Sequence, residues 1–99
     1  MSAYNVVRFR VKSGREQAFI DTHKRSKLDF GGFRKGSLIK TGDRDFCFIG
    51  EWNGYADIVA ARPAMIAFLE TFRGDLEDLG NDLGVTDPVS GPVVADIAG

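Results

Sequence analysis

The chain opens on an alternation of apolar and polar residues that is typical of a β-strand with one buried face. Over residues 4–12, Val7, Phe9 and Val11 fall on one side and basic residues fall on the other. Because side chains alternate across a strand, one face of this segment is predicted to pack against a core.

Three further segments predict strands. Residues 33–40 and 46–52 are rich in β-formers, and the polar connection 41–45 between them is typical of a hairpin turn. Residues 89–97 predict a last strand. Pro92 places that strand at a sheet edge, because proline donates no ladder hydrogen bond.

The first predicted helix covers about residues 14–27, where Phe19 and His23 share the more apolar side. Ser13 lies three residues before Glu16, which is the spacing of a capping box. We therefore expect these two side chains to cap the start of the helix.

The second predicted helix begins near Tyr55 and passes Pro63, where we expect a kink or a restart because proline clashes with the preceding turn. Gly80 is a candidate for its C-terminal cap. A broad apolar stripe follows helical spacing; its members are Met65, Phe68, Leu69, Phe72, Leu76 and Leu79.

The element order β-α-β-β-α-β predicts an α+β, ferredoxin-like fold with a four-stranded antiparallel sheet. Both helices then cover one face, and the other face is left bare. Alternation in the third strand puts either Phe46, Phe48 and Trp52 or Cys47 and Ile49 on the bare face. Either set is apolar enough to need cover, from a second copy of the chain or from a ligand.

Composition narrows the class of protein. The 99 residues predict a single domain spanning 1–99, with 43% hydrophobic and 27% charged residues. Without an apolar run long enough for a membrane span or a signal peptide, we expect a cytoplasmic protein with no membrane partner. One cysteine and one histidine exclude disulfide frameworks and sites that need two imidazoles, so no metal site is expected.

Charge is unevenly distributed along the chain. Residues 1–50 carry eleven Lys and Arg against five Asp and Glu, whereas residues 51–99 carry two against nine. Such asymmetry indicates a nucleic-acid surface, an acidic tail or two elements that neutralise each other. In a ferredoxin-like fold the two helices lie side by side, so we expect the basic first helix and the acidic second helix to screen each other.

Four parts of the chain carry a resemblance to a known family: 6–12 followed by 13–16, 32–38, 46–52 with its terminal Glu51-Trp52, and the helix 63–72. Together these segments resemble the antibiotic biosynthesis monooxygenase-like (ABM) branch of the dimeric α/β barrel superfamily. This resemblance implies a homodimer whose sheets enclose a barrel, and a small pocket between sheet and helices. Some members oxidise aromatic molecules there with no cofactor, neither metal nor flavin.

The sequence departs from the haem-degrading members of this group. They need a histidine in the second helix, and no histidine follows Trp52. Val7 occupies the region of the first strand where they place an asparagine. The sequence therefore disfavours haem degradation and leaves a non-catalytic, ligand-binding or assembly module as the alternative to an oxygenase.

A second resemblance is to RNA-recognition motifs, which share the element order. Residues 44–51 match about half of their third-strand signature, but Asp45 replaces a glycine and Glu51 replaces a stacking aromatic. RNA binding is thus the third interpretation, and we expect no nucleic-acid partner.

The resemblance implies a substrate pocket, for which we predict an apolar lining of Trp52, Phe48, Phe68 and Phe72, with Tyr55 at the mouth. A small planar organic molecule would bind there and, once deprotonated, react with O2. Glu51 and His23 are the candidate catalytic bases. Three of these residues also have a purely structural interpretation. Trp52 would fill the core, Glu51 would pair with Arg8 or Arg10, and His23 would be a half-buried ring with one hydrogen bond.

Overall fold

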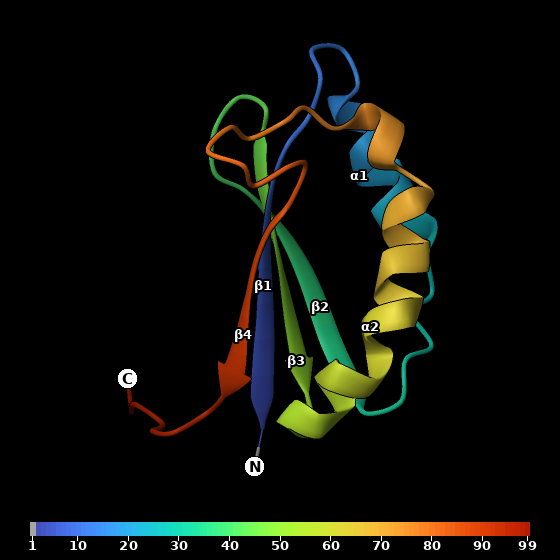
Figure 1. Ribbon diagram of the computed structural model, residues 1–99. Helices are drawn as coiled ribbons and strands as arrows, with labels where there is room; N and C mark the ends of the chain where they lie inside the picture. The colour runs from blue at the N-terminus through green and yellow to red at the C-terminus, as the bar shows by residue number, and fades with distance from the viewer. Residues whose placement is uncertain (1) are drawn as a thin grey trace.

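The computed structural model describes residues 2–99 and contains a four-stranded antiparallel sheet of order β2-β3-β1-β4. Figure 1 shows both helices on one face of this sheet and the other face uncovered. The predicted ferredoxin-like arrangement is confirmed. The elements are β1 (Ala3–Arg10), α1 (Glu16–Arg25), β2 (Phe33–Lys40), β3 (Asp45–Trp52), α2 (Tyr55–Glu70), the short 3-10 helix η1 (Arg73–Asp75) and β4 (Asp87–Pro92).

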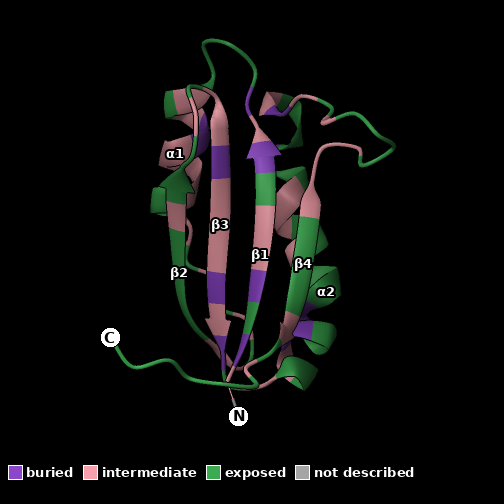
Figure 2. Ribbon diagram, turned by 90° about the vertical axis from the view of Figure 1, so that its left-hand side faces the viewer, coloured by how far each residue is buried: buried purple, intermediate pink, exposed green. Residues whose placement is uncertain are grey.

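Strand β1 lies at the centre of the sheet and follows the predicted alternation. Ala3, Asn5 and Phe9 are buried toward the helices, whereas Tyr4 and Arg8 are exposed. Figure 2 looks onto the uncovered face and shows buried and more exposed residues alternating along this strand. The alternation arises because consecutive side chains of a strand point to opposite faces.

The uncovered face carries the less aromatic of the two candidate sets. Phe46 and Trp52 of β3 are buried on the helix side, so Cys47 and Ile49 lie on the open side. Strand pairing places Val6 directly opposite Ile49. The uncovered face therefore has an apolar strip at its centre, which includes Val6, Cys47 and Ile49, and no helix covers this strip.

The core has two parts. The larger is built around Phe9, Phe19, Phe46 and Phe72, with rings that meet edge-on or tilted at centroid distances of 5.1–5.7 Å. Such aromatic pairs add to the stabilisation that burial alone provides. The smaller part is formed by Ala3, Trp52, Ile58 and Ala61.

The predicted capping box is wrong. The chain makes a tight turn in which Arg15 N donates to Lys12 O at 3.0 Å and Gly14 has φ +84°. Arg15 rather than Ser13 is thereby the residue that precedes α1, and it makes no side-chain cap. Glu16 Oε1 is instead buried and has no hydrogen-bond partner within residues 2–99.

Of the kink or restart expected at Pro63, the restart is wrong, because α2 is one helix with Pro63 inside it. Pro63 and the preceding turn at Val59 are exposed, so water can satisfy the carbonyl that the proline leaves without an amide donor. The helix ends at Glu70, well before Gly80, which lies in a later turn with φ +81°.

The segment after α2 leaves the helical path because it pairs with the end of β1. Lys12 N donates to Asp75 O and Glu77 N donates to Arg10 O, both at 2.8 Å. Leu76 forms an isolated bridge with Val11, and both side chains are buried. This segment thus pairs its backbone with β1 and is not helical, while its apolar side chain in the predicted stripe, Leu76, still packs in the core.

Strand β4 covers Asp87–Pro92, so the predicted last strand begins earlier and ends earlier than residues 89–97. It pairs with β1 alone and is an edge strand, as Pro92 predicts. The tail beyond it leaves Val94 and Ile97 88% and 93% exposed. In Figure 1 this tail extends on the side of the sheet away from the helices.

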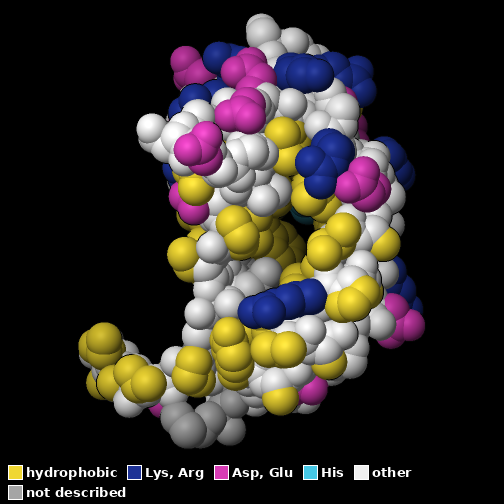
Figure 3. Space-filling view, in the orientation of Figure 1, with side chains coloured by type: hydrophobic (Ala, Val, Ile, Leu, Met, Phe, Trp, Pro, Cys, Tyr) yellow, Lys and Arg dark blue, Asp and Glu magenta, His cyan; other side chains and the backbone are white. Residues whose placement is uncertain are grey.

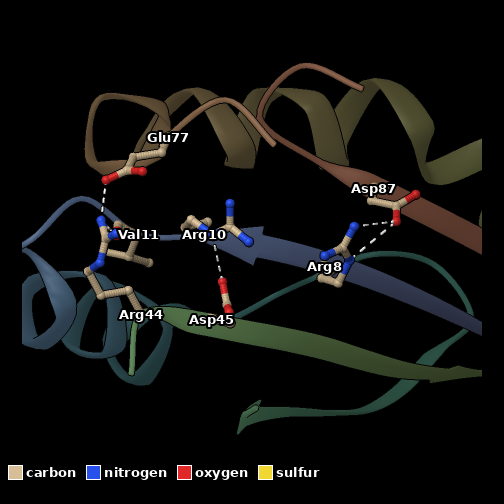
Figure 4. A network of polar contacts seen from close by, with 7 residues as sticks. All are labelled: Arg8, Arg10, Val11, Arg44, Asp45, Glu77 and Asp87. Atoms are coloured by element: carbon tan, nitrogen blue, oxygen red, sulfur yellow. Dashed lines mark hydrogen bonds and ion pairs between the residues drawn. The ribbon is translucent and has the colours of Figure 1, made fainter. Parts of the chain in front are cut away.

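The basic and acidic halves of the chain meet mainly at the sheet and the loops. Figure 4 shows Arg8 with Asp87 across β1 and β4, and Arg44 with Glu77. Within residues 2–99 no ion pair joins α1 to α2. The expectation of helix-to-helix screening is wrong because most acidic residues of the second half follow α2 rather than belong to it. The pairs between the halves are Arg8–Asp87, Arg15–Asp75, Arg34–Glu51 and Arg44–Glu77.

Within residues 2–99, no helix has the length and apolar character of a membrane span.

Candidate functional site

An apolar cavity of about 430 Å³ lies between α2 and the strands β1 and β4, and the segment after α1 closes part of it. Figure 3 shows the molecule hollowed at this place, with hydrophobic side chains around the opening. Most of the lining is aromatic or aliphatic. The polar residues that reach the cavity are Asn5, His23, Arg62, Thr86 and Ser90. A mostly apolar cavity with a few polar groups is the usual form of a small-molecule site.

His23 enters the cavity from α1 and is surrounded by phenylalanine rings. Its ring centroid lies 4.5 Å from that of Phe19, 4.7 Å from that of Phe72 and 5.3 Å from that of Phe68. Burial among these rings removes water from the imidazole. Desolvation therefore lowers the pKa of His23 below 6.5, against a smaller opposing effect of its hydrogen bond to Phe19.

The hydrogen bond also fixes which ring nitrogen carries the proton. His23 Nδ1 lies 2.9 Å from the carbonyl oxygen of Phe19, and a carbonyl can only accept. Nδ1 is thus the donor in the neutral ring, and Nε2 keeps its lone pair. The cavity contains an uncharged imidazole with one basic nitrogen.

Asn5 comes from β1 and is 5% exposed. Trp52 Nε1 donates to its Oδ1 at 2.7 Å, and because an indole N–H can only donate, the amide orientation is set. The amide nitrogen then lies on the side of Met65, whose sulfur is a weak acceptor 3.8 Å away. Asn5 Nδ2 therefore has donor capacity left for a ligand in the cavity.

Glycine at position 50 makes room for this amide. Gly50 is paired with Asn5 in the sheet. A Cβ at Gly50 would overlap Asn5 Oδ1 and would lie 3.1 Å from Trp52 Nε1. The three residues form one packed unit, in which the absence of a side chain at one position allows the hydrogen bond between the other two.

The structure brings together four of the residues predicted to form the site. The cavity is lined by Phe48 of β3, Phe68 of α2, Phe72 from the two residues just after α2, and His23 of α1. Trp52 is fully buried behind Asn5 and does not line the cavity. It contributes by holding the amide.

The two remaining predicted residues lie elsewhere. Tyr55 is the first residue of α2, is 38% exposed and does not line the cavity. Glu51 alternates with Trp52 and so lies on the open face of the sheet, where Arg34 Nη1 is 3.5 Å from its Oε2. The expected partner for Glu51 was Arg8 or Arg10. That expectation is wrong, because those arginines pair with Asp87 and Asp45.

Asn5 is the functional candidate that the sequence analysis missed. A signal for it was present: Asn5 is two residues before Val7 and shares the buried side of β1, where a polar side chain needs a partner. Its partner in Trp52 is 47 positions away in the sequence, which no local pattern could reveal.

The aromatic residues of the partial RNA-recognition signature do not face solvent on the open side of the sheet. Phe46 is 1% exposed and Phe48 lines the cavity beneath the helices. Stacking of bases needs aromatic rings on the open face. The basis for the RNA-binding interpretation is therefore removed.

Within residues 2–99, no cluster of three or more His, Cys, Asp or Glu side chains is arranged to hold a metal ion.

Comparison with known proteins identifies the fold. No family model matches the sequence, and no curated protein matches it. Solved structures of ABM domain proteins match nearly the whole chain. They include a putative antibiotic biosynthesis monooxygenase from Chloroflexus aurantiacus, 10% identical with TM-score 0.70 over 99% of this chain and 98% of that chain.

Two more structures show the range of what shares this fold. SnoaB from Streptomyces nogalater, described as a cofactor-independent oxygenase, is 16% identical with TM-score 0.72 over 97% of this chain and 96% of its own. The NE2512 protein of unknown function from Nitrosomonas europaea is 16% identical with TM-score 0.73 over 99% of this chain and 94% of its own. At these identities the comparison shows the ABM fold and leaves the activity open.

Proposed function

We propose that this protein binds a planar organic molecule in the cavity and oxidises it with O2, without a metal or a flavin. The observation that carries the proposal is the combination of an apolar lining with two deep polar groups, the neutral imidazole of His23 and the fixed amide of Asn5. One can remove a proton from a ligand, and the other can stabilise the negative charge that results.

His23 acts as the general base. Its Nε2 accepts a proton from a phenol or an enol of the ligand, and the rings around it exclude water. Because desolvation lowers its pKa, the imidazole is uncharged and ready to accept a proton at neutral pH. The deprotonated ligand is electron-rich enough to react with O2 directly.

Asn5 acts at the other end of the cavity. His23 packs near Phe9, and Asn5 precedes Phe9 by four positions in β1, which is a rise of about 13 Å along the strand. A ligand that reaches both groups is an extended, fused-ring molecule. Deprotonation near His23 then delocalises charge through the rings to an oxygen that accepts a hydrogen bond from Asn5 Nδ2.

The oxidation balances without an added reductant when a ring methylene becomes a carbonyl. One oxygen atom of O2 enters the ligand as C=O, and the other leaves as water together with the two hydrogens of the CH2 group. The electrons come from the two broken C–H bonds. The description of SnoaB as a cofactor-independent oxygenase supports this chemistry for the shared fold.

We also propose that two copies of the chain pair through the open sheet face. Its centre is apolar. Val89, 63% exposed, pairs with Val6, which pairs with Ile49, and Ile39, 43% exposed, pairs with Cys47. Ion pairs such as Arg10–Asp45 flank this strip and are satisfied within one chain. An apolar centre with a polar rim is the usual anatomy of a protein interface.

Oxygen consumption tests the catalytic proposal. The protein is mixed with a panel of dihydroxyaromatic compounds and anthrone-like compounds that carry a ring methylene, and O2 uptake is followed with an electrode. His23→Gln should abolish the uptake and Arg73→Gln, outside the cavity, should not. Loss of uptake in Glu51→Gln but not in His23→Gln would instead identify Glu51 as the base.

Binding without oxidation is a separate outcome. If panel compounds perturb the cavity residues in NMR spectra and no O2 is consumed, the protein is the non-catalytic ligand-binding module. If no compound binds, the cavity is not a ligand site.

A further inference from the structure

Among the residues of the described range 2–99 that line the cavity, Arg62 is the only one with a permanent charge. It extends from the middle of α2 and is exposed. Figure 3 shows one basic side chain lying across the lower rim of the hollow, with hydrophobic side chains beside it. Within residues 2–99 no aspartate or glutamate lines the cavity, so a ligand there meets the guanidinium without a competing carboxylate on the wall.

The arginine has no acidic partner within residues 2–99. The six ion pairs found among these described residues use other arginines. Its neighbours one helical turn away on α2 are all apolar: Ile58, Val59, Met65 and Ile66. The other arginine of the acidic half, Arg73, is paired with Glu70 at 2.9 Å.

Hydroxyl groups face the same cavity from the opposite wall. Thr86 precedes β4 and Ser90 lies within it, and both line the cavity together with Arg62. A hydroxyl donates to an anionic oxygen as readily as to a neutral one, and a guanidinium can hold both oxygens of a carboxylate at once. The rim thus combines one charged donor with neutral donors around an apolar interior.

We propose that the molecule bound in this cavity is an organic anion: a planar ring system inside the cavity, with a carboxylate at the rim held by Arg62. This inference rests on the proposed function, because it names the ligand class of the same cavity. The surroundings strengthen the interaction, since a charge pair beside apolar walls is screened less than one in open water.

A pair of matched probes tests the inference: naphthalene-2-carboxylate and its neutral analogue naphthalene-2-carboxamide. Dissociation constants are measured by NMR titration or calorimetry with the full chain and with Arg62→Gln. The wild-type protein should bind the carboxylate more tightly than the amide. Arg62→Gln should weaken carboxylate binding by roughly tenfold or more and leave amide binding unchanged.

Arg73→Gln is the control, because it removes the same charge from the same half of the chain outside the cavity. It should change neither dissociation constant. If the two probes bind equally well, or if Arg62→Gln keeps the preference for the carboxylate, the anion inference is overturned while the cavity remains a ligand site. If neither probe binds, the proposed function fails and the inference fails with it.

Discussion

Trp52 and Asn5 form a buried hydrogen bond that joins β3 to β1 beneath the helices, with the indole Nε1 donating to Oδ1 at 2.7 Å. The bond uses the only donor of the indole and the acceptor oxygen of the amide. The NH2 group of the amide therefore remains free to donate to a ligand in the cavity. A core tryptophan thereby determines how a site residue is oriented without touching the cavity itself.

Replacing Asn5 with alanine should destabilise the protein by about 1–3 kcal/mol, because the buried indole N–H of Trp52 loses its acceptor. Urea unfolding at one fixed protein concentration measures the change. Ser13→Ala, an exposed position in the turn before α1, is the control and should stay within about 0.5 kcal/mol of the wild type. Equal stability of the two variants would mean that the indole finds another acceptor.

Replacing Gly50 with alanine should have a similar or larger effect. The new methyl group would overlap Asn5 Oδ1 and crowd Phe48 and Trp52, each with an atom 3.1 Å away. Overpacking of this kind costs about 1–3 kcal/mol. Thermal unfolding, followed by the near-ultraviolet signal of Trp52, gives the change in stability together with any disturbance of the indole.

Gly91→Ala is the matched control for that substitution. Gly91 also lies in a strand, β4, and a Cβ there would meet nothing within 4 Å. We expect no loss of stability at this position. If both alanines destabilise the protein equally, the effect at Gly50 reflects strand glycine in general rather than the packed amide.

Stability should fall as the pH is lowered through the range below 6.5. Burial lowers the pKa of His23 in the folded state, so the unfolded chain binds a proton at a higher pH than the folded chain does. The neutral ring contributes its full stabilisation at pH values above 6.5, the pKa of histidine in the unfolded chain. This contribution is lost as the pH falls toward the lower pKa of His23 in the folded protein.

Urea midpoints measured at pH 7.5 and pH 5.5 test this dependence. His23→Gln should show a smaller difference between the two values than the wild type, because glutamine does not titrate. Carboxylates that titrate near the lower pH contribute equally to both proteins. An unchanged difference in His23→Gln would assign the dependence to those groups alone.

Ile49→Asp should dissociate the proposed homodimer. Ile49 lies at the centre of the open face, opposite Val6 of β1 and Ser37 of β2. Two copies of a new carboxylate buried at an interface would each lack a partner, which strongly opposes association. Size-exclusion chromatography with light scattering reports the mass of wild type and variant.

Lys24→Asp is the matched control, since Lys24 is an exposed residue of α1, which covers the opposite face of the sheet. It should leave the dimer intact. A wild-type protein that is monomeric at micromolar concentration would contradict the pairing of the open faces.

Short-range pattern was enough to predict most of the fold. The alternation of Val7 and Phe9 placed one face of β1 against the core, and Pro92 placed β4 at an edge. These predictions succeed because side-chain direction within a strand is set by the backbone of that strand alone. The same holds for the segment 33–40, which is a strand over its predicted length.

The spacing of side chains gave wrong predictions where backbone hydrogen bonds favoured another conformation. Leu76 continues the helical spacing of apolar residues from α2, yet residues 75–77 pair with the end of β1. Ser13 and Glu16 have the spacing of a capping box, yet the turn at Gly14 moves the start of α1 past Ser13. In each case a backbone hydrogen bond not encoded in the local spacing decided the outcome.

The candidate site likewise combines features that the sequence predicts with features that only the fold determines. The sequence by itself determined the order of the elements and supplied the aromatic residues Phe48, Phe68 and Phe72, because periodicity marks buried faces. Only the tertiary structure decided that Asn5 and Arg62 belong to the site and that Glu51 lies on the opposite face of the sheet. The physical reason is that a cavity forms between elements far apart in the chain, so its polar groups are selected by packing and not by neighbours in sequence.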